Sequence, residues 1–146
     1  MASYYLNEAV IDLPERRFVD KTIHGLEAKL PGDKTLGVLV TRREVEAGQS
    51  LRALVDENIE LNQRRLGSFT RIEEKHAKVG GLPAILLSTR WRRDGRDLYQ
   101  RQAHVLVGAQ HLIFAVSGPL DERRTCDDTF GIMVETISWR SAGDLT

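Results

Sequence analysis

Few residues in this sequence could perform catalysis or bind a metal. They are four histidines and one cysteine: His24, His76, His104, His111 and Cys126. No two histidines stand at a spacing typical of a zinc site. Cys126 falls on the apolar side of a predicted helix, where cysteine is usually a packing residue. The sequence has no GxSxG, Walker, dinucleotide-binding or HExxH motif, so we expect no catalytic residues, no metal site and no cofactor.

Two asparagines are the more informative polar residues. The apolar residues of the predicted helix Leu51–Leu66 form one broad arc at about 100° per residue, and Asn58 and Asn62 lie in its middle, one turn apart. Burying an amide without hydrogen-bond partners is costly, so buried amides are usually satisfied. Two interpretations stay open. The asparagines bond to the backbone or to Gln100 and Gln102 in the core, or they line a groove that a partner fills.

A hairpin is predicted around Asp94 and Gly95, because Asp-Gly is the preferred pair for a tight two-residue turn. This turn creates one face without formal charge, apart from a protonated histidine. The face pairs Trp91 with Leu98, Thr89 with Gln100, Leu87 with Gln102, and Ile85 with His104. This uncharged face is the predicted working side.

The opposite face of the hairpin carries arginines. It pairs Arg92 with Asp97, Arg90 with Tyr99, and Ser88 with Arg101. One interpretation is a solvated face with ordinary cross-strand ion pairs, which also protects a hairpin against edge pairing. The other is a binding surface for an acidic partner. We expect the solvated face.

Composition limits the function further. The chain has 146 residues, with 21 Lys and Arg against 21 Asp and Glu, so its formal net charge is zero. A nucleic-acid or anionic-membrane binder typically has a basic excess. The sequence has no apolar run long enough to span a bilayer and no signal-peptide pattern at its start. A single cysteine cannot form an internal disulfide. We expect a soluble cytoplasmic protein with no nucleic-acid partner and no stable membrane insertion.

The pattern of elements predicts an α+β fold in one domain, residues 1–146. Ser50 is the predicted N-cap of the first helix, and Asp121 of the second, whose apolar stripe runs from Cys126 to Ile137. The predicted strands are one or two within 4–13, then Phe18–Lys29, Thr35–Arg43, Ser68–Val79, the two hairpin strands, and His111–Ser117. Together they form a curved antiparallel sheet of about six strands, with helices after the third strand and at the end.

Five stretches add a family resemblance. They are YYLNEAVIDLP, DKTI, VTRRE, GLPAILLSTRWRRDGRDL and RQAHVL, and the GRDL…RQ segment after the turn is the most specific. In this order and spacing they resemble the DcrB-like domain family and, within it, the Eag chaperones of bacterial type VI secretion. The resemblance covers nearly the whole chain. It implies a Mog1/PsbP-like fold that is commonly dimeric.

The resemblance also implies an adaptor rather than an enzyme. Eag chaperones hold the apolar N-terminal transmembrane segments of an effector in the cytoplasm, shield them from water, and help load the effector onto the VgrG spike. The expected partners are therefore such an effector, the VgrG spike through that effector, and a second copy of this chain as a homodimer.

By position, the resemblance implies a partner-binding groove formed by Ile23, Gly25, Leu39, Thr41, Asn58, Asn62, Leu66, Leu98 and Gln102. Gly25, Gly37 and Asn62 differ from the side chains expected in the family. Gly25 removes an apolar wall and Asn62 adds polarity. The residue patterns alone had already placed Asn58 on an apolar arc, and Leu98 and Gln102 on the uncharged hairpin face.

Two other functions remain open. One is a general protein-binding module of the same fold with a folded, polar partner. The other is an enzyme or small-molecule binder that uses His104 and Gln102 in a pocket; a deep closed cavity and a histidine with a perturbed pKa would favour it.

Overall fold

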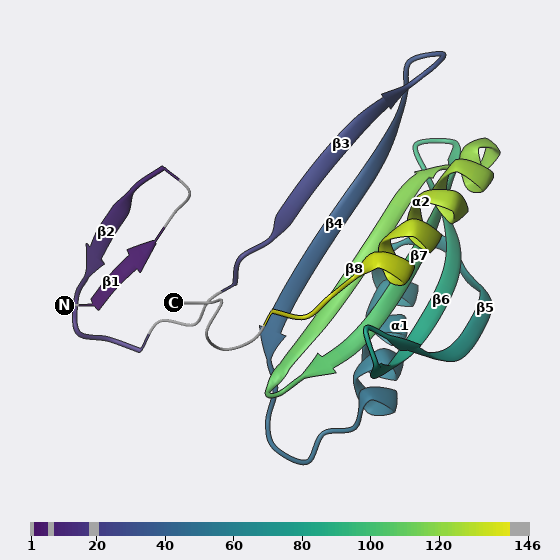
Figure 1. Cartoon of the computed structure of the whole chain (residues 1–146). Coiled ribbons are helices and arrows are strands. Elements are labelled where there is room, and N and C mark those ends of the chain that lie inside the picture. Colours follow the sequence, from purple (N-terminus) through teal and green to yellow (C-terminus); the bar gives the residue numbers. More distant parts are fainter. Residues whose placement is uncertain (1, 6–7, 18–20, 141–146) are drawn as a thin grey trace.

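A six-stranded antiparallel sheet is the centre of the computed structural model, which describes residues 2–5, 8–17 and 21–140 (Figure 1). Its strand order is β3-β4-β8-β7-β6-β5. The strands are β3 (His24–Leu30), β4 (Lys34–Glu44), β5 (Gly67–Val79), β6 (Leu82–Arg93), β7 (Arg96–Val107) and β8 (Gln110–Pro119). The predicted N-terminal strand pair forms a separate two-stranded sheet of β1 (Ala2–Tyr5) and β2 (Val10–Leu13).

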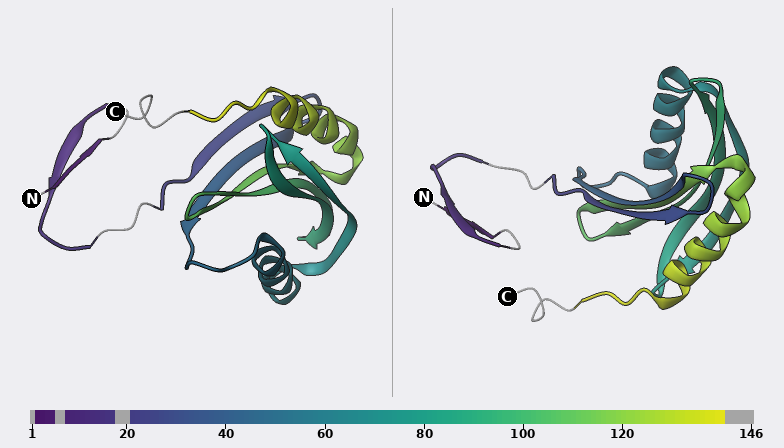
Figure 2. Two further views of the ribbon diagram at one scale, coloured as in Figure 1. Left: turned by 60° about the horizontal axis from the view of Figure 1, so that its bottom comes forward. Right: turned by 90° about the horizontal axis from the view of Figure 1, so that it is seen from above.

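Two helices cover opposite faces of the large sheet, and the sheet curls around the first of them (Figure 2). Helix α1 (Leu51–Arg65) packs Val55 and Ile59 on Ile85 and Leu87 of β6. Helix α2 (Arg123–Thr136) packs Cys126 and Phe130 on the other face, against Leu36, Tyr99, Ala103 and Val116. The α+β prediction with about six strands and two main helices is confirmed.

The hairpin of β6 and β7 has the predicted register, including Trp91 opposite Leu98 and Leu87 opposite Gln102. Asp94 and Gly95 have φ values of 51° and 75°, as a tight turn of this type requires. Because side chains alternate along a strand, this register sends Gln102 towards α1 and Arg101 towards α2.

Two boundary predictions are wrong. The strand predicted at Phe18–Lys29 begins only at His24, and residues 18–20 of that prediction lie outside the described residues. Asp121 does not cap α2. It lies in a short 3₁₀ helix, η1 (Leu120–Glu122), where it accepts a hydrogen bond from Lys34 Nζ at 2.9 Å, and the N-cap of α2 is Glu122. Because the 3₁₀ helix occupies residues 120–122, Asp121 lies one residue before the N-cap position, and its carboxylate pairs with the lysine of β4.

The predicted N-cap of α1 is confirmed. Ser50 Oγ accepts a hydrogen bond from the backbone N–H of Ala53 at 3.1 Å. The helix passes into β5 through one residue, Leu66.

Replacement of this cap gives a test of the fold. We expect Ser50→Ala to reduce the free energy of unfolding by about 1 kcal/mol, because the Ala53 N–H loses its acceptor. Ser138→Ala, at an exposed position beyond α2, is the matched control and should change it little. Chemical denaturation measures both; equal values for the two variants would contradict the capping role.

Candidate functional site

A pocket of about 220 Å³ opens between α1 and the inner face of the sheet. Its apolar side chains come from three strands, β4, β6 and β8, and from the end of α1, and its polar side chains are mainly amides. The lining residues are Leu39, Thr41, Asn58, Asn62, Leu66, Trp91, Gln100, Gln102, Ile113 and Ala115.

Most of the predicted groove residues line this pocket: Leu39, Thr41, Asn58, Asn62, Leu66 and Gln102. Three predicted residues do not. Gly25 pairs with Leu39 on the edge strand β3, and Ile23 precedes β3 with 62% of its surface exposed. Leu98 lies nearer the hairpin tip, opposite Trp91 and Pro119. All three stay predictions as partner-binding residues.

The sequence did not predict Ile113 and Ala115 of β8 as lining residues. They lie opposite His104 and Gln102 in the β7–β8 pairing. The sequence predicted Trp91 and Gln100 on the uncharged hairpin face, but they were not among the predicted groove residues. The alternation along His111–Ser117 contained the missing information, since residues 113 and 115 share the side of His111.

The two asparagines bond to each other rather than to the glutamines. Asn62 Nδ2 donates to Asn58 Oδ1 at 3.2 Å, and Gln102 Nε2 donates separately to Gln100 Oε1 at 2.5 Å. The specific bonds expected between the asparagines and Gln100 or Gln102 are not among those described. Both pairs lie at the pocket, where they add hydrogen-bonding groups to apolar walls.

A buried pair of histidines continues the hydrogen bonds of the glutamine pair into the core. His104 Nε2 lies 2.8 Å from Gln102 Oε1, and His104 Nδ1 lies 3.0 Å from His111 Nε2. The two imidazole rings are stacked with centroids 5.2 Å apart. His104 is 0% exposed and His111 1% exposed. Within the described part of the chain, His111 Nδ1 has no hydrogen-bond partner.

Burial keeps both histidines neutral. It lowers the pKa of His104 to about 3 and that of His111 to about 4, because the charged form loses its hydration. A histidine with a perturbed pKa was one expected sign of a small-molecule site. However, neither ring is among the residues that line the pocket, and His104 lies fully buried behind Gln102.

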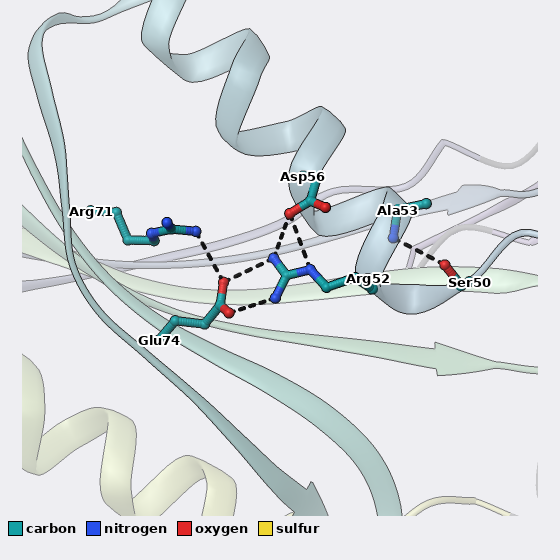
Figure 3. A network of polar contacts seen from close by, with 6 residues as sticks. All are labelled: Ser50, Arg52, Ala53, Asp56, Arg71 and Glu74. Atoms are coloured by element: carbon teal, nitrogen blue, oxygen red, sulfur yellow. Dashed lines mark hydrogen bonds and ion pairs between the residues drawn. The ribbon is translucent and has the colours of Figure 1, made fainter.

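Helix α1, one wall of the pocket, is held to β5 by a charged network (Figure 3). Arg52 donates to both carboxylate oxygens of Glu74, at 2.5 and 2.9 Å, and also to Asp56. Arg71 donates to Glu74 at 3.2 Å. These hydrogen bonds, chiefly that from Arg52, hold the pKa of the Glu74 carboxyl below its usual range. On the other side, Arg43 of β4 lies 3.6 Å from Glu57 of α1.

The arginine face of the hairpin lies towards α2. Arg101 pairs with Asp127 at 3.1 Å and stacks on the Phe130 ring at 4.5 Å. Arg92, on the same face, is exposed. Part of the arginine face therefore packs against α2 and part is solvated. Arg93 and Arg96 are also exposed, but they pair next to Trp91 and Leu98 and lie on the other face, so the face predicted to be uncharged has two arginines at its tip.

The other candidate groups give no catalytic arrangement. Burial raises the pKa of the Cys126 thiol to about 11, so it stays protonated and acts as a packing residue. Among the described residues, no cluster of three or more His, Cys, Asp or Glu side chains could hold a metal ion. No helix in that part of the chain is both long and apolar enough to cross a membrane. A larger hollow, about 650 Å³, lies near the hairpin tip and is lined partly by Asp33, Lys34, Arg96, Asp97 and Asp121.

Comparison with known families identifies the chain. The model of the family described as DcrB matches residues 8–136. The chain belongs to the DcrB family. A relative named Effector EagT6, from Pseudomonas aeruginosa, is 27% identical over 106 residues, which is 72% of this chain and 73% of that protein.

Solved structures with the same fold agree with this family. The crystal structure of PA94, a protein of unknown function from Pseudomonas aeruginosa, has a TM-score of 0.79 at 21% identity and covers 97% of this chain and 99% of its own. LpqN, involved in cell envelope biogenesis of Mycobacterium tuberculosis, has a TM-score of 0.65 at 16% identity, covering 78% and 69%. Cyanobacterial PsbP from Synechocystis has a TM-score of 0.53 at 13% identity, covering 77% and 79%. The expected PsbP-like fold is confirmed.

The network that holds α1 predicts a selective loss of stability. We expect Glu74→Gln to reduce the free energy of unfolding by about 1 kcal/mol, since the carboxylate accepts several charge-assisted bonds but is partly exposed. Glu60→Gln is the matched control, because the Glu60–Arg64 pair on the same helix is largely exposed. Urea unfolding measures both. A Glu74 variant as stable as the control would show that the network does not anchor α1.

The buried histidines predict a pH dependence. Both folded pKa values lie below the unfolded value of 6.5, so their contribution to stability is fully present above about pH 6.5 and lost as the pH falls towards 4 and then 3. Between pH 7 and pH 5 the free energy of unfolding should fall by a few kcal/mol. His76→Gln, at an exposed histidine, should leave this slope unchanged. A flat profile over this range would contradict burial of two neutral histidines.

Proposed function

We propose that this protein is a cytoplasmic chaperone-adaptor of type VI secretion. It binds the apolar N-terminal transmembrane segment of an effector, shields it from water, and helps load the effector onto the VgrG spike. It works as a homodimer and has no catalytic activity. The observation that carries the proposal is the combination of apolar walls and paired amides in one pocket beside α1.

This combination suits an apolar helix that carries small polar residues. Burial of its apolar side chains would supply most of the affinity, at about 25 cal/mol per Å² before the costs of association. Amides and hydroxyls form the hydrogen bonds between helices in membranes, where small residues allow close approach. Asn58 and Gln102 would then set which part of the helix lies opposite the groove.

The pocket itself is smaller than a helix, so the bound segment would extend along the surface beyond it. Exposed apolar side chains lie on that side: Leu39 of β4, at the pocket, is 42% exposed, and Ile23, just before β3, is 62% exposed. Leu98 continues the pocket towards the hairpin tip. Relationship to the protein named Effector EagT6 supports a role beside a secreted effector.

Co-purification tests the proposal directly. The tagged protein is expressed with the product of the neighbouring gene, with and without the apolar N-terminal segment of that product. We expect stable co-elution that is lost when the segment is deleted. Solubility of the neighbour on its own, without co-elution, would contradict the chaperone role.

Two substitutions test the groove. We expect Gln102→Ala and Leu98→Asp each to weaken binding of the apolar segment by about tenfold or more, through loss of a hydrogen bond or of apolar contact. Arg92→Ala, on the opposite hairpin face, is the control. Binding is measured by pull-down and titration, with circular dichroism to confirm the fold. Full binding by both variants would overturn the groove assignment.

A folded, polar partner is the second candidate function. The hollow of about 650 Å³ near the hairpin tip favours it, because charged side chains of both signs line it. In that case Arg96→Ala would weaken binding of the partner more than Gln102→Ala.

A further inference from the structure

We propose that His104 and His111 are positioning residues for the groove. Their hydrogen-bond chain orients the side-chain amides of Gln102 and Gln100, so that the groove floor offers N–H donors to an oxygen atom of the bound segment. This inference rests on the proposed function and names the chemistry that the groove selects. It adds two fully buried residues, which do not line the pocket, to those that determine what the groove binds.

The direction of this hydrogen-bond chain follows from its acceptors. Gln102 Oε1 can only accept, so the His104 Nε2 atom at 2.8 Å carries the hydrogen. In a neutral imidazole the other nitrogen has none, so His104 Nδ1 accepts from His111 Nε2 at 3.0 Å. Both rings therefore hold their hydrogen on Nε2, and His111 Nδ1 is left with a lone pair.

The reverse direction is less favourable. With the Gln102 amide turned over, every bond in the chain would reverse, and His111 would hold its hydrogen on Nδ1. That atom is buried and has no partner among the described residues. Orphaned buried N–H groups are rarer in proteins than unsatisfied acceptors.

Burial is the main reason that the pair stays neutral, and the charged groups around it add to this effect. After burial, His111, then Arg52 of α1 and Arg43 of β4, lower the pKa of His104. Arg43 also lowers the pKa of His111, whereas Glu57 of α1 raises it. A neutral ring is required, because a charged His104 would donate from both nitrogens and could not accept from His111. Near neutral pH the hydrogen-bond chain therefore runs in one direction, from His111 through His104 to Gln102.

The two glutamine amides consequently direct their oxygens along the hydrogen-bond chain, Gln102 towards His104 and Gln100 towards Gln102. Asn58 also uses its oxygen, as the acceptor from Asn62, although no histidine orients that pair. The described residues show no bond from the Gln100 N–H groups or the Asn58 N–H groups. A hydroxyl of Ser or Thr, or a backbone carbonyl exposed beside a small residue, is the matching group on an apolar helix.

The orientation of the hydrogen-bond chain is fixed because water does not reach its members. Gln102 is 6% exposed, and both histidines are at most 1% exposed. Turning the Gln102 amide alone would set its N–H against the N–H of His104 and break two hydrogen bonds. Without His104, the same amide could turn freely and offer either its oxygen or its hydrogens.

The first experiment reads the tautomers in the whole protein without any partner. Nitrogen-15 NMR of the histidine side chains at pH 7 should show both rings neutral with the hydrogen on Nε2. A hydrogen on Nδ1 of His104, or a charged ring, would overturn the proposed direction. This result does not depend on the proposed function.

The second experiment tests selectivity with two synthetic apolar helical peptides of about 20 residues, each fused to a soluble carrier. One has Thr at the positions facing the groove, and the other has Val, which has the same shape without the hydroxyl. We expect the wild type to prefer the Thr peptide by about tenfold. His104→Phe should show a weaker preference, because an unlocked Gln102 amide has to be ordered before it can bond the hydroxyl. Arg92→Ala is the control and should retain the preference.

The outcomes separate the two proposals. His104→Gln, which can still donate to Gln102, should restore part of the preference if positioning is the role. A full Thr preference in His104→Phe would overturn the positioning role alone. If neither peptide binds the wild type, the proposed function fails, whatever the NMR result. Should His104→Phe not fold, the wild-type tautomers still decide the direction of the chain.

Discussion

The pairing of β7 with both β6 and β8 is the constraint on which the rest of the structure depends. Because β7 is bonded on both edges, its side chains alternate strictly between the two faces of the sheet. Tyr99, Ala103 and Val105 join the cores on the α2 side, whereas Gln100, Gln102 and His104 face α1. A shift of one residue would exchange these sets, placing Arg101 in the groove and amides beneath α2.

That register also explains how much the sequence could predict. The Asp94-Gly95 turn is local, so the pairing of β6 with β7 could be read directly from the chain, together with the face of Gln102. Helix α1 could be located from its apolar arc and from Ser50. These two local elements supplied Asn58, Asn62 and Gln102, which are the main polar groups of the pocket.

The other features of the pocket and of the helix ends depend on contacts between segments that are distant in the sequence. Ile113 and Ala115 enter the pocket only because β8 lies between β4 and β7. The bond between His104 and His111 requires the β7–β8 turn to place two rings on one face. Asp121 is a residue type that favours the N-cap, yet it binds Lys34 of β4, which no pattern within the helix could indicate. A family resemblance added Leu39 and Thr41 of β4, because no pattern within that strand indicates which of its residues face the pocket.

The direct passage of α1 into β5 has a consequence for how the groove accommodates a ligand. One residue, Leu66, joins helix to strand, and Arg52 fastens the opposite end of the helix to Glu74 of β5. A helix fixed at both ends cannot swing outwards like a lid. A cavity held in this way is preformed, so a segment of the kind proposed would lose little conformational entropy on entering and would have to match the existing width. Such a site would discriminate between helices by the size of the side chains at the contact, independently of their hydrogen bonds.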